Sequence, residues 1–207
     1  MISSKKELQF YIMADMMMNR GKYKQSLKDR IKHIIISDYI MQYLKSMRYC
    51  AYYSNVQHTA ISDLILKPFH EIRYRKLGIK LGFSIGPNTL GYGVVIPHYG
   101  TIVVGNSNRL GNYAVLHTST CISDNGKIIG DALYLATGAK MTSNLTLGDN
   151  ISVGANSVVN KSFNSNCMIA GAPAIKIKDA EAWYVRDGQE YSDKVDGIEK
   201  LKITLNL

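Results

Sequence analysis

The chain has 207 residues, of which 46% are apolar and 20% are charged. This length and composition suit one compact domain with a smaller addition, and they argue against a disordered chain. No run of eighteen apolar residues occurs, so no membrane-spanning helix is expected. The cysteines Cys50, Cys121 and Cys167 are odd in number and scattered, so neither a disulfide framework nor a metal site is expected.

The net charge of +9 belongs to the first part of the chain. Residues 1–82 contain fifteen Lys and Arg against six Asp and Glu, whereas residues 83–207 contain ten of each. Such a segment is either a solvated helical surface or a contact for an anionic partner. An anionic membrane surface or a lipid-linked glycan fits better than nucleic acid, because no nucleic-acid motif accompanies the charge. No signal peptide is recognised, which predicts a cytoplasmic protein, with peripheral attachment at the inner membrane face as a second option.

Residues 1–82 are expected to be helical. Apolar residues recur at helical spacings over 27–47, and Ser26 precedes this run as a candidate N-cap. A second helix is expected over about 62–76, with Pro68 as the position of a kink.

After Gly82 the helical period is replaced by a period of six. Two short runs come first, namely Leu90, Ile96 and Ile102, and then Leu110, Leu116 and Ile122. The longest run follows: Ile129, Leu135, Met141, Leu147, Val153 and Val159. We place a two-residue change of register at 105–108 and a one-residue change at 124–127. A β-sandwich would instead alternate with period two, so this pattern argues against it.

A sixfold period predicts a triangular coil in which each flat side points one aliphatic residue inward. Stacked coils bury these residues against each other. Small residues and asparagines are expected at the corners, where left-handed backbone angles are tolerated. The asparagines that fit are Asn88, Asn112, Asn144, Asn150 and Asn156. The expected fold is therefore mainly β, with a parallel β-helix over 83–178, a helical segment over 1–82 before it, and a short tail over 179–207. The stacked coils form a triangular prism, and Trp183 and Tyr184 of the tail are expected to pack on it.

Three segments of the repeat resemble a known family. They are "LGFSIGPNTLGYGVVIPHYGTIVVGN", "IGDALYLATGAKMTSNLTLGDNISVGANSVV" and "AGAPAIKIK". They resemble the hexapeptide-repeat acyltransferases, and among these the short serine O-acetyltransferases of polysaccharide-synthesis clusters. The resemblance implies a left-handed coil, an acetyl-CoA-dependent O-acetyltransferase activity, and a homotrimer with sites between subunits.

The resemblance also implies that His98 is the general base. A neutral imidazole with a pKa near about 6.5 can take the proton of an acceptor hydroxyl as that hydroxyl attacks a thioester. His117 lies one coil further on, and we expect it to face outward and contact the acceptor. Packing in a coil turn, or a hydrogen bond to the backbone, is the structural alternative for His98. His33, His58 and His70 lie in helical segments and are expected to be structural or surface residues.

The donor, acetyl-CoA, is expected in a groove between adjacent coils of neighbouring subunits. The small residues that match this groove are Gly138, Ala139, Gly154, Ala155, Gly171, Ala172 and Pro173. Lys176 and Lys178 follow and are expected to meet the CoA phosphates as point charges. Corner geometry alone also explains the glycines. No metal is expected, because the histidines of the prism lack a third partner for zinc.

The sequence departs from serine-specific members around the acceptor. Pro97 stands where an aspartate usually precedes the histidine, and Phe83 stands where another aspartate contacts the amino acid. Residues 121–131 are also too short for the loop that carries an Arg-His pair. A saccharide or polysaccharide intermediate is therefore the acceptor we favour. Free serine, giving O-acetylserine, is the alternative, and a catalytically inactive binding or structural prism is the alternative of another class.

Overall fold

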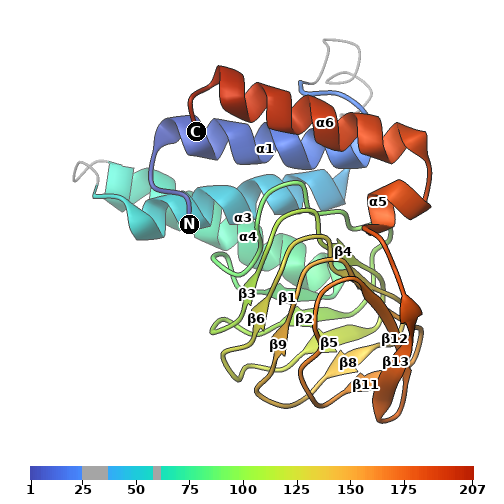
Figure 1. Cartoon of the computed structure of the whole chain (residues 1–207). Coiled ribbons are helices and arrows are strands. Elements are labelled where there is room, and N and C mark those ends of the chain that lie inside the picture. Colours follow the sequence, from blue (N-terminus) through green and yellow to red (C-terminus); the bar gives the residue numbers. More distant parts are fainter. Residues whose placement is uncertain (25–36, 58–61) are drawn as a thin grey trace.

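The structure, a computed structural model, describes residues 1–24, 37–57 and 62–207, and combines a layer of helices with a coil of short strands (Figure 1). The helices are α1 (Lys5–Arg20), α3 (Tyr39–Asn55), the π-helical turn η1 (Ser62–Leu66), α4 (Lys67–Leu81), α5 (Trp183–Arg186) and α6 (Gln189–Thr204). Within these described ranges, no helix combines the length and the apolarity that crossing a bilayer requires.

The N-terminal helices differ in detail from those expected. Helix α3 carries the second half of the helical pattern over 27–47, whereas 25–36, with Ser26 and His33, lies outside the described residues. His58 also lies outside them. Helix α4 continues to Leu81, further than expected, and Pro68 stands in its first turn. Pro68 therefore lies just after the π-helical turn η1 passes into α4, where the first α-helical turn does not use the N–H that proline lacks.

The β-helix, a stack of coils, consists of thirteen short strands. They are β1 (Phe83–Ile85), β2 (Ile102–Val104), β3 (Arg109–Leu110), β4 (Val115–Leu116), β5 (Thr120–Ile122), β6 (Ile128–Ile129), β7 (Tyr134–Leu135), β8 (Lys140–Met141), β9 (Thr146–Leu147), β10 (Ile151–Val153), β11 (Val158–Val159), β12 (Cys167–Gly171) and β13 (Ala174–Asp179). Sheet A has the order β1-β2-β5-β8-β11, sheet B has β3-β6-β9, and sheet C has β13-β12-β10-β7-β4. All neighbours are parallel except β12 and β13, which form the closing hairpin.

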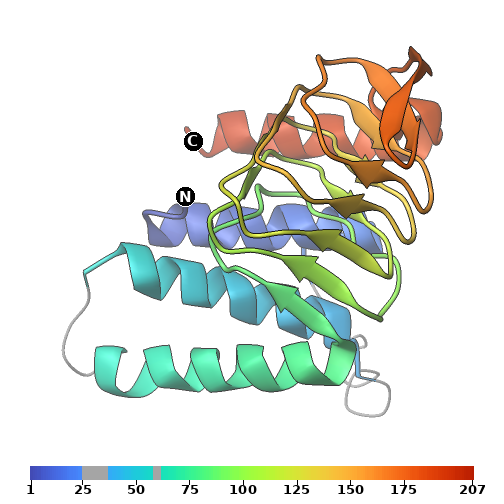
Figure 2. The ribbon, with the colours of Figure 1, turned by 90° about the horizontal axis from the view of Figure 1, so that it is seen from below.

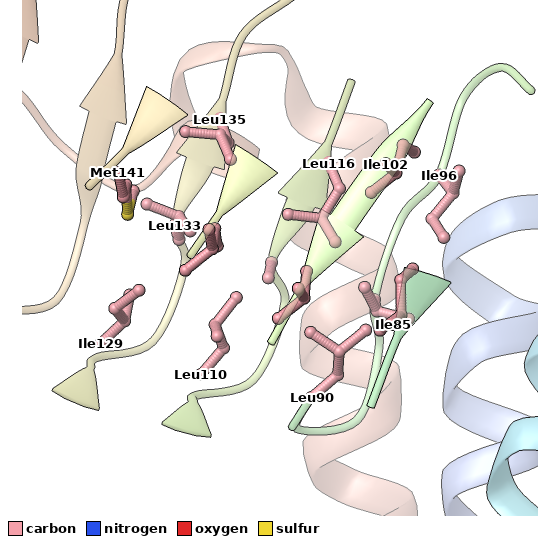
Figure 3. Packing of buried hydrophobic residues seen from close by; sticks show 14 of the residues in the cluster. Ile85, Leu90, Ile96, Ile102, Leu110, Leu116, Ile129, Leu133, Leu135 and Met141 are labelled. Carbon is pink, nitrogen blue, oxygen red and sulfur yellow. The ribbon is translucent and has the colours of Figure 1, made fainter. Parts of the chain in front are cut away.

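The sixfold pattern is the core of this coil, so the predicted parallel β-helix is confirmed. All twelve residues of the three runs are at most 6% exposed. Those that Figure 3 labels, such as Leu110, Leu116 and Leu135, point into the prism. Burying an aliphatic side chain of this size stabilises the fold by roughly 1.5–3 kcal/mol. A single coil could not bury its own inward residues, so stacking is what stabilises the strands.

The first change of register lies elsewhere than predicted. Val104, rather than Ile102, pairs with Ile122 in sheet A. The inward step from Ile96 to Val104 is therefore eight residues, whereas the equivalent step from Leu116 to Ile122 is six. The two extra residues fall within 97–103 and not at 105–108. The pattern could not decide this, because Ile102 and Val104 are both apolar and both buried. The one-residue change at 124–127 is confirmed by the pairing of sheets A and B.

Left-handed backbone angles at the corners account for only some of the small residues and asparagines. Asn150 and Asn156 adopt left-handed angles, with φ of 58° and 56°, but the other three asparagines predicted for corners do not. Gly130 has an ordinary φ, and a Cβ there would lie 2.2 Å from Oδ1 of Asp149 in the next coil. Close stacking of coils, and not only the turn, therefore requires glycine at this position.

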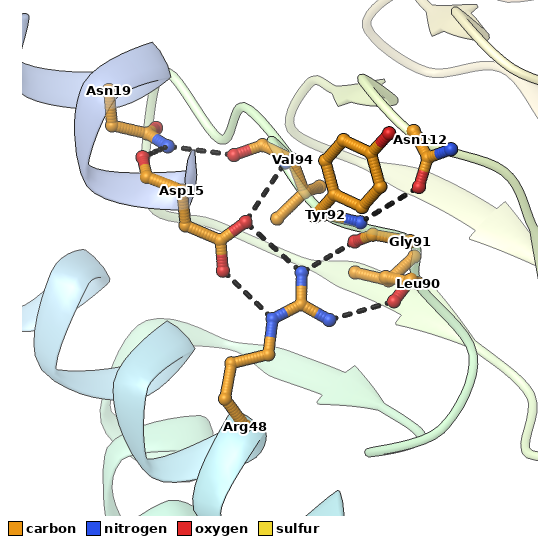
Figure 4. A network of polar contacts seen from close by, with 8 residues as sticks. All are labelled: Asp15, Asn19, Arg48, Leu90, Gly91, Tyr92, Val94 and Asn112. Carbon is orange, nitrogen blue, oxygen red and sulfur yellow. Dashed lines mark hydrogen bonds and ion pairs between the residues drawn. The ribbon is translucent and has the colours of Figure 1, made fainter. Parts of the chain in front are cut away.

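The helices form one layer in the order α6, α1, α3, α4 (Figures 1 and 2). A buried ion pair joins this layer to the first coil (Figure 4). Arg48 Nε donates to Asp15 Oδ2 at 2.8 Å, and the same guanidinium donates to the carbonyls of Leu90 and Gly91. Asp15 Oδ1 in turn accepts from the N–H of Val94. Two helices and one coil are thus held by a single polar cluster.

The tail does not hang free but returns to the start of the coil. Trp183 Nε1 donates to the carbonyl of Tyr113 at 2.7 Å, and the rings of Trp183 and Tyr184 both pack on the prism, which confirms their expected packing. Helix α6 then runs beside α1, and its Glu199 accepts hydrogen bonds from the hydroxyls of Tyr92 and Tyr113.

Candidate active site

The corner between sheets C and A gathers most of the residues predicted for the site. His98 lies at this corner in the first coil. His117 lies at it in the second, because Val95 pairs with Val115 just before the two corners. Small residues occupy the same corner in the later coils: Gly138, Ala139, Gly154, Ala155 and Gly171. The candidate residues therefore line one edge of the prism.

His98 lies in the corner that the two extra residues enlarge. Its side chain is exposed, as are those of Pro97 and Tyr99 on either side. The N–H of Gly100 donates to the carbonyl of Leu81 at 2.9 Å, which fixes the far end of this corner against α4. In the described part of the chain no hydrogen bond holds the imidazole. Hence a ligand at this edge can reach the ring directly.

His117 is half-buried and has a defined partner. Its Nε2 lies 2.9 Å from the hydroxyl oxygen of Tyr134, which belongs to the next coil. Burial lowers the pKa of His117, the nearby His98 lowers it further, and Asp187 opposes both effects. The imidazole is therefore neutral at neutral pH, so it can either donate or accept one hydrogen bond at the edge.

The C-terminal segment reaches this edge as well. The guanidinium of Arg186 lies 4.6 Å from the centre of the Tyr134 ring, and its Nη1 donates to Ser152 Oγ at 3.0 Å. Its Nε donates to Asp187 at 2.6 Å. Burial raises the pKa of Tyr134, so its hydroxyl stays protonated. Sequence reasoning missed Tyr134 and Arg186, because one is an ordinary outward repeat position and the other lies in the tail without a motif.

The residues predicted to bind acetyl-CoA are small, but their backbone N–H groups are already engaged in hydrogen bonds. The N–H groups of Gly138, Ala139 and Gly154 all donate to carbonyls of the coil. Ala139 is buried, whereas Ala155 is exposed. The side chain of Lys140 also lies at this corner, where its ammonium donates to the carbonyl of Gly138 at 3.0 Å and to that of Ser119.

The remaining residues predicted to bind acetyl-CoA lie at the C-terminal end of the β-helix. Gly171 ends β12, and Ala172 and Pro173 form the exposed turn to β13. Lys176 and Lys178 follow on β13, and Lys176 Nζ pairs with Asp179 at 2.6 Å. The turn thus continues the edge that carries His98, while the two lysines lie beyond it on the added strand.

The other metal-binding and nucleophilic side chains are dispersed. Residues 1–24, 37–57 and 62–207 contain no group of three His, Cys, Asp or Glu that could hold a metal ion. Cys50, Cys121 and Cys167 are free thiols, and burial raises the pKa of Cys50 to about 12. His70 stacks on Tyr49 with the ring centres 4.1 Å apart, a structural contact.

No protein-family model matches the chain. It is 31% identical over 105 residues to a serine acetyltransferase of Staphylococcus xylosus, which covers 47% of this chain and 49% of the relative. A serine acetyltransferase of Synechococcus elongatus is 30% identical over 100 residues, which is 44% of this chain and 41% of the relative. The matched region thus spans about half the length of these curated relatives.

Solved serine acetyltransferases share the fold. The enzyme from Brucella abortus strain S19 superposes with a TM-score of 0.60 at 20% identity, over 84% of this chain and 69% of that one. A serine acetyltransferase in complex with CoA gives a TM-score of 0.59 at 18% identity, over 83% and 68%. The chain is thus a parallel β-helix protein with a six-residue repeat, and it resembles the serine acetyltransferases in sequence and in fold.

Proposed function

We propose that the protein is an acetyl-CoA-dependent O-acetyltransferase in which His98 is the general base. The observation that carries the proposal is the position of His98, exposed in an enlarged corner on the edge that also holds the small residues of the later coils. The sequence similarity to serine acetyltransferases supports the reaction class. The similar structure with bound CoA supports the donor.

The chemistry needs one base and no covalent intermediate on the protein. The neutral imidazole of His98 takes the proton of the acceptor hydroxyl as its oxygen attacks the carbonyl carbon of the thioester. The carbon–sulfur bond then breaks, the thiolate of CoA leaves, and the imidazolium returns a proton to it. The products are an acetate ester and free CoA thiol. His117, with its hydrogen bond to Tyr134, is proposed to contact the acceptor.

The proposed acceptor is a saccharide or polysaccharide intermediate. Phe83 occupies the position of an aspartate that would meet an amino group, and its ring is buried 5.1 Å from the ring of Tyr43. Pro97 has no group to orient the imidazole or to bind an ammonium ion. Free serine is the second candidate, favoured by the names of the relatives. A sugar hydroxyl needs neither of the missing carboxylates.

The proposal is tested by acceptor profiling. The protein is incubated with acetyl-CoA and either serine or a panel of sugars, and the released thiol is measured. His98→Ala is expected to lower the rate about a hundredfold or more. Efficient turnover of serine without turnover of any sugar would contradict the saccharide acceptor. Release of no thiol with any acceptor would favour an inactive prism.

A homotrimer belongs to the same proposal, with each site formed between two subunits related by cyclic symmetry. Light scattering is expected to give three times the chain mass, and a monomer that keeps full activity would contradict this. The proposed location is the cytoplasm.

A further inference from the structure

Helix α4 and the turn before it expose a continuous set of large apolar side chains. Among the described residues they form an apolar stripe: Leu64, Ile65, Phe69, Ile72 and Ile79. Ile79 is 85% exposed and Leu64 is 78% exposed, so these are not core residues that reach the surface at one edge. Scattered single apolar residues on a surface are ordinary, but five within η1 and the helix α4 that follows it are not.

The spacing places the stripe on one side of the helix. Phe69, Ile72 and Ile79 are separated by three and then seven residues, which returns to the same side after one and two turns. The opposite side packs inward through Leu77 and Leu81, which are buried against the rest of the fold. Helix α4 is therefore apolar on two sides, and packing within the described residues explains only one of them.

Basic side chains border the stripe. Arg73 and Lys80 lie along the side that faces α3, where Arg73 donates to Gln42 and the Lys80 ammonium lies 3.5 Å from the centre of the Tyr39 ring. Arg75 lies on the other side of the stripe, and Lys76 lies within it, both exposed. Long basic side chains can lay their methylene groups along an apolar surface while the charge reaches polar surroundings.

The position of α4 makes this surface accessible. It is the last helix of the layer, at the opposite end from α6 (Figure 2). Residues 1–82 carry the whole net charge of +9, so the stripe lies in the most basic part of the chain. A second copy of the chain on this face would bring two sets of cations together, which disfavours that occupant.

We propose that the apolar stripe of α4, with its border of Lys and Arg, docks the protein on the surface of an anionic lipid bilayer. The stripe would enter the boundary between headgroups and acyl chains, and the cations would meet the lipid phosphates. Helices that lie in a membrane interface combine an apolar side with Lys and Arg in this way. Each cation near an anionic surface strengthens binding about fivefold at low salt.

The test uses the full chain and vesicles of phosphatidylcholine with or without phosphatidylglycerol. Cosedimentation is expected with the anionic vesicles only, and it should fall at least about tenfold when salt shortens the Debye length to about 3 Å. The double substitution Ile72→Glu with Ile79→Glu should reduce binding at least about tenfold. Ile177→Glu with Ile203→Glu is the matched control, because it adds the same charge at positions that are 54% and 74% exposed on β13 and α6, outside the stripe; it should bind like the unchanged protein.

Four results would overturn the proposal. Vesicle binding could be absent at low salt, or it could be equal with neutral vesicles. The double substitution could leave binding unchanged while circular dichroism shows that the fold is intact. Finally, the double substitution could lower the mass in light scattering, which would mean that a second copy covers this face. None of these measurements depends on the acetyltransferase activity.

Discussion

His117 is the titrating side chain whose surroundings the structure defines best at the candidate site. Its ring is half-buried, shares a hydrogen bond with Tyr134, and lies near a second imidazole, that of His98. Each of the last two features restricts the ring in a different way. The hydrogen bond fixes its orientation, and the neighbouring charge disfavours its protonation. The imidazole of His117 should therefore be neutral at neutral pH.

The pH dependence of stability follows from this lowered pKa. Since His117 has a lower pKa in the folded than in the unfolded chain, it stabilises the fold fully above its ordinary value of about 6.5. That stabilisation is lost as the pH falls through the folded-state value. NMR titration of the ring should give a midpoint below 6.5. His117→Gln should flatten the fall of the unfolding free energy in this acidic range, and an unchanged slope would contradict the assignment.

The glycines that permit coils to stack close together give a second prediction. Gly130→Ala places a methyl group 2.2 Å from Oδ1 and 2.8 Å from the backbone nitrogen of Asp149. The backbone atom cannot move aside cheaply, so the unfolding free energy should fall by about 1–3 kcal/mol in urea denaturation. Gly126 is the control, because no atom lies within 4 Å of a Cβ there and its φ is 72°. Asparagine tolerates such angles, so Gly126→Asn should change stability by less than about 0.5 kcal/mol.

The sequence predicted a residue of the candidate site where a local motif marks it. It did not predict residues that come to the site through contacts with distant parts of the chain. His98 is an example of the first kind, since a motif and an outward position suffice to place it at an exposed corner. The Tyr134–His117 contact and the Arg186–Ser152 bond are examples of the second. They join residues 17 and 34 positions apart, and no local pattern marks either partner.

Among the secondary-structure elements, α1 and α3 depend on one buried ion pair to meet the coil. Asp15 and Arg48 are each 1% exposed, and the guanidinium also satisfies two carbonyls of the first coil. A pair of this kind adds little to stability when it is replaced as a whole, but breaking it leaves one buried charge without a partner. Its effect is therefore to define how the two helices lie on the coil.

Arg48→Met should lower the unfolding free energy by about 3–5 kcal/mol, because Asp15 would remain buried and unpaired. Adding Asp15→Leu should restore part of the loss. It should not restore all of it, since the carbonyls of Leu90 and Gly91 would still lack their donor. Chemical denaturation measures each variant. Lys176→Met removes a pair with Asp179 in which the two side chains are 55% and 88% exposed, and it should cost less than about 1 kcal/mol; a loss comparable to that of Arg48→Met would contradict the reasoning.

The fold was predictable from the sequence to the extent that one buried residue per side determines it. Every coil repeats the same requirement, so the period of six is read directly from Ile129 to Val159. The corner at 97–103 was not predictable, because sliding the register by two residues keeps an apolar side chain inside. Helix α6 was missed for another reason. Its apolar residues meet α1 and the first coils, which are distant in sequence, and burial there leaves no short repeat.

At the scale of the whole molecule, the chain closes on itself. Repeat proteins are usually built so that each unit contacts only its neighbours, which permits stepwise unfolding. Here the tail contacts Ser152 in a late coil, Tyr113 in the second and Tyr92 in the first. It then lies beside α1 at the other end of the sequence (Figure 1). The C-terminal segment therefore spans the stack and joins its ends.

Cooperative unfolding is the expected consequence. The chain has a single tryptophan, Trp183, whose ring lies between α6 and the coil, so its fluorescence reports on the tail alone. Its urea transition should coincide with that of far-ultraviolet circular dichroism, which reports on all helices and strands.

Ile198→Ala, at a position that is 0% exposed on α6, should shift both transitions together and cost about 2–5 kcal/mol. Ile203→Ala, on the exposed side of the same helix, should shift neither by more than about 0.5 kcal/mol. If fluorescence changed at a lower urea concentration than circular dichroism, the tail would be an appendage, and the stack would be stable without it.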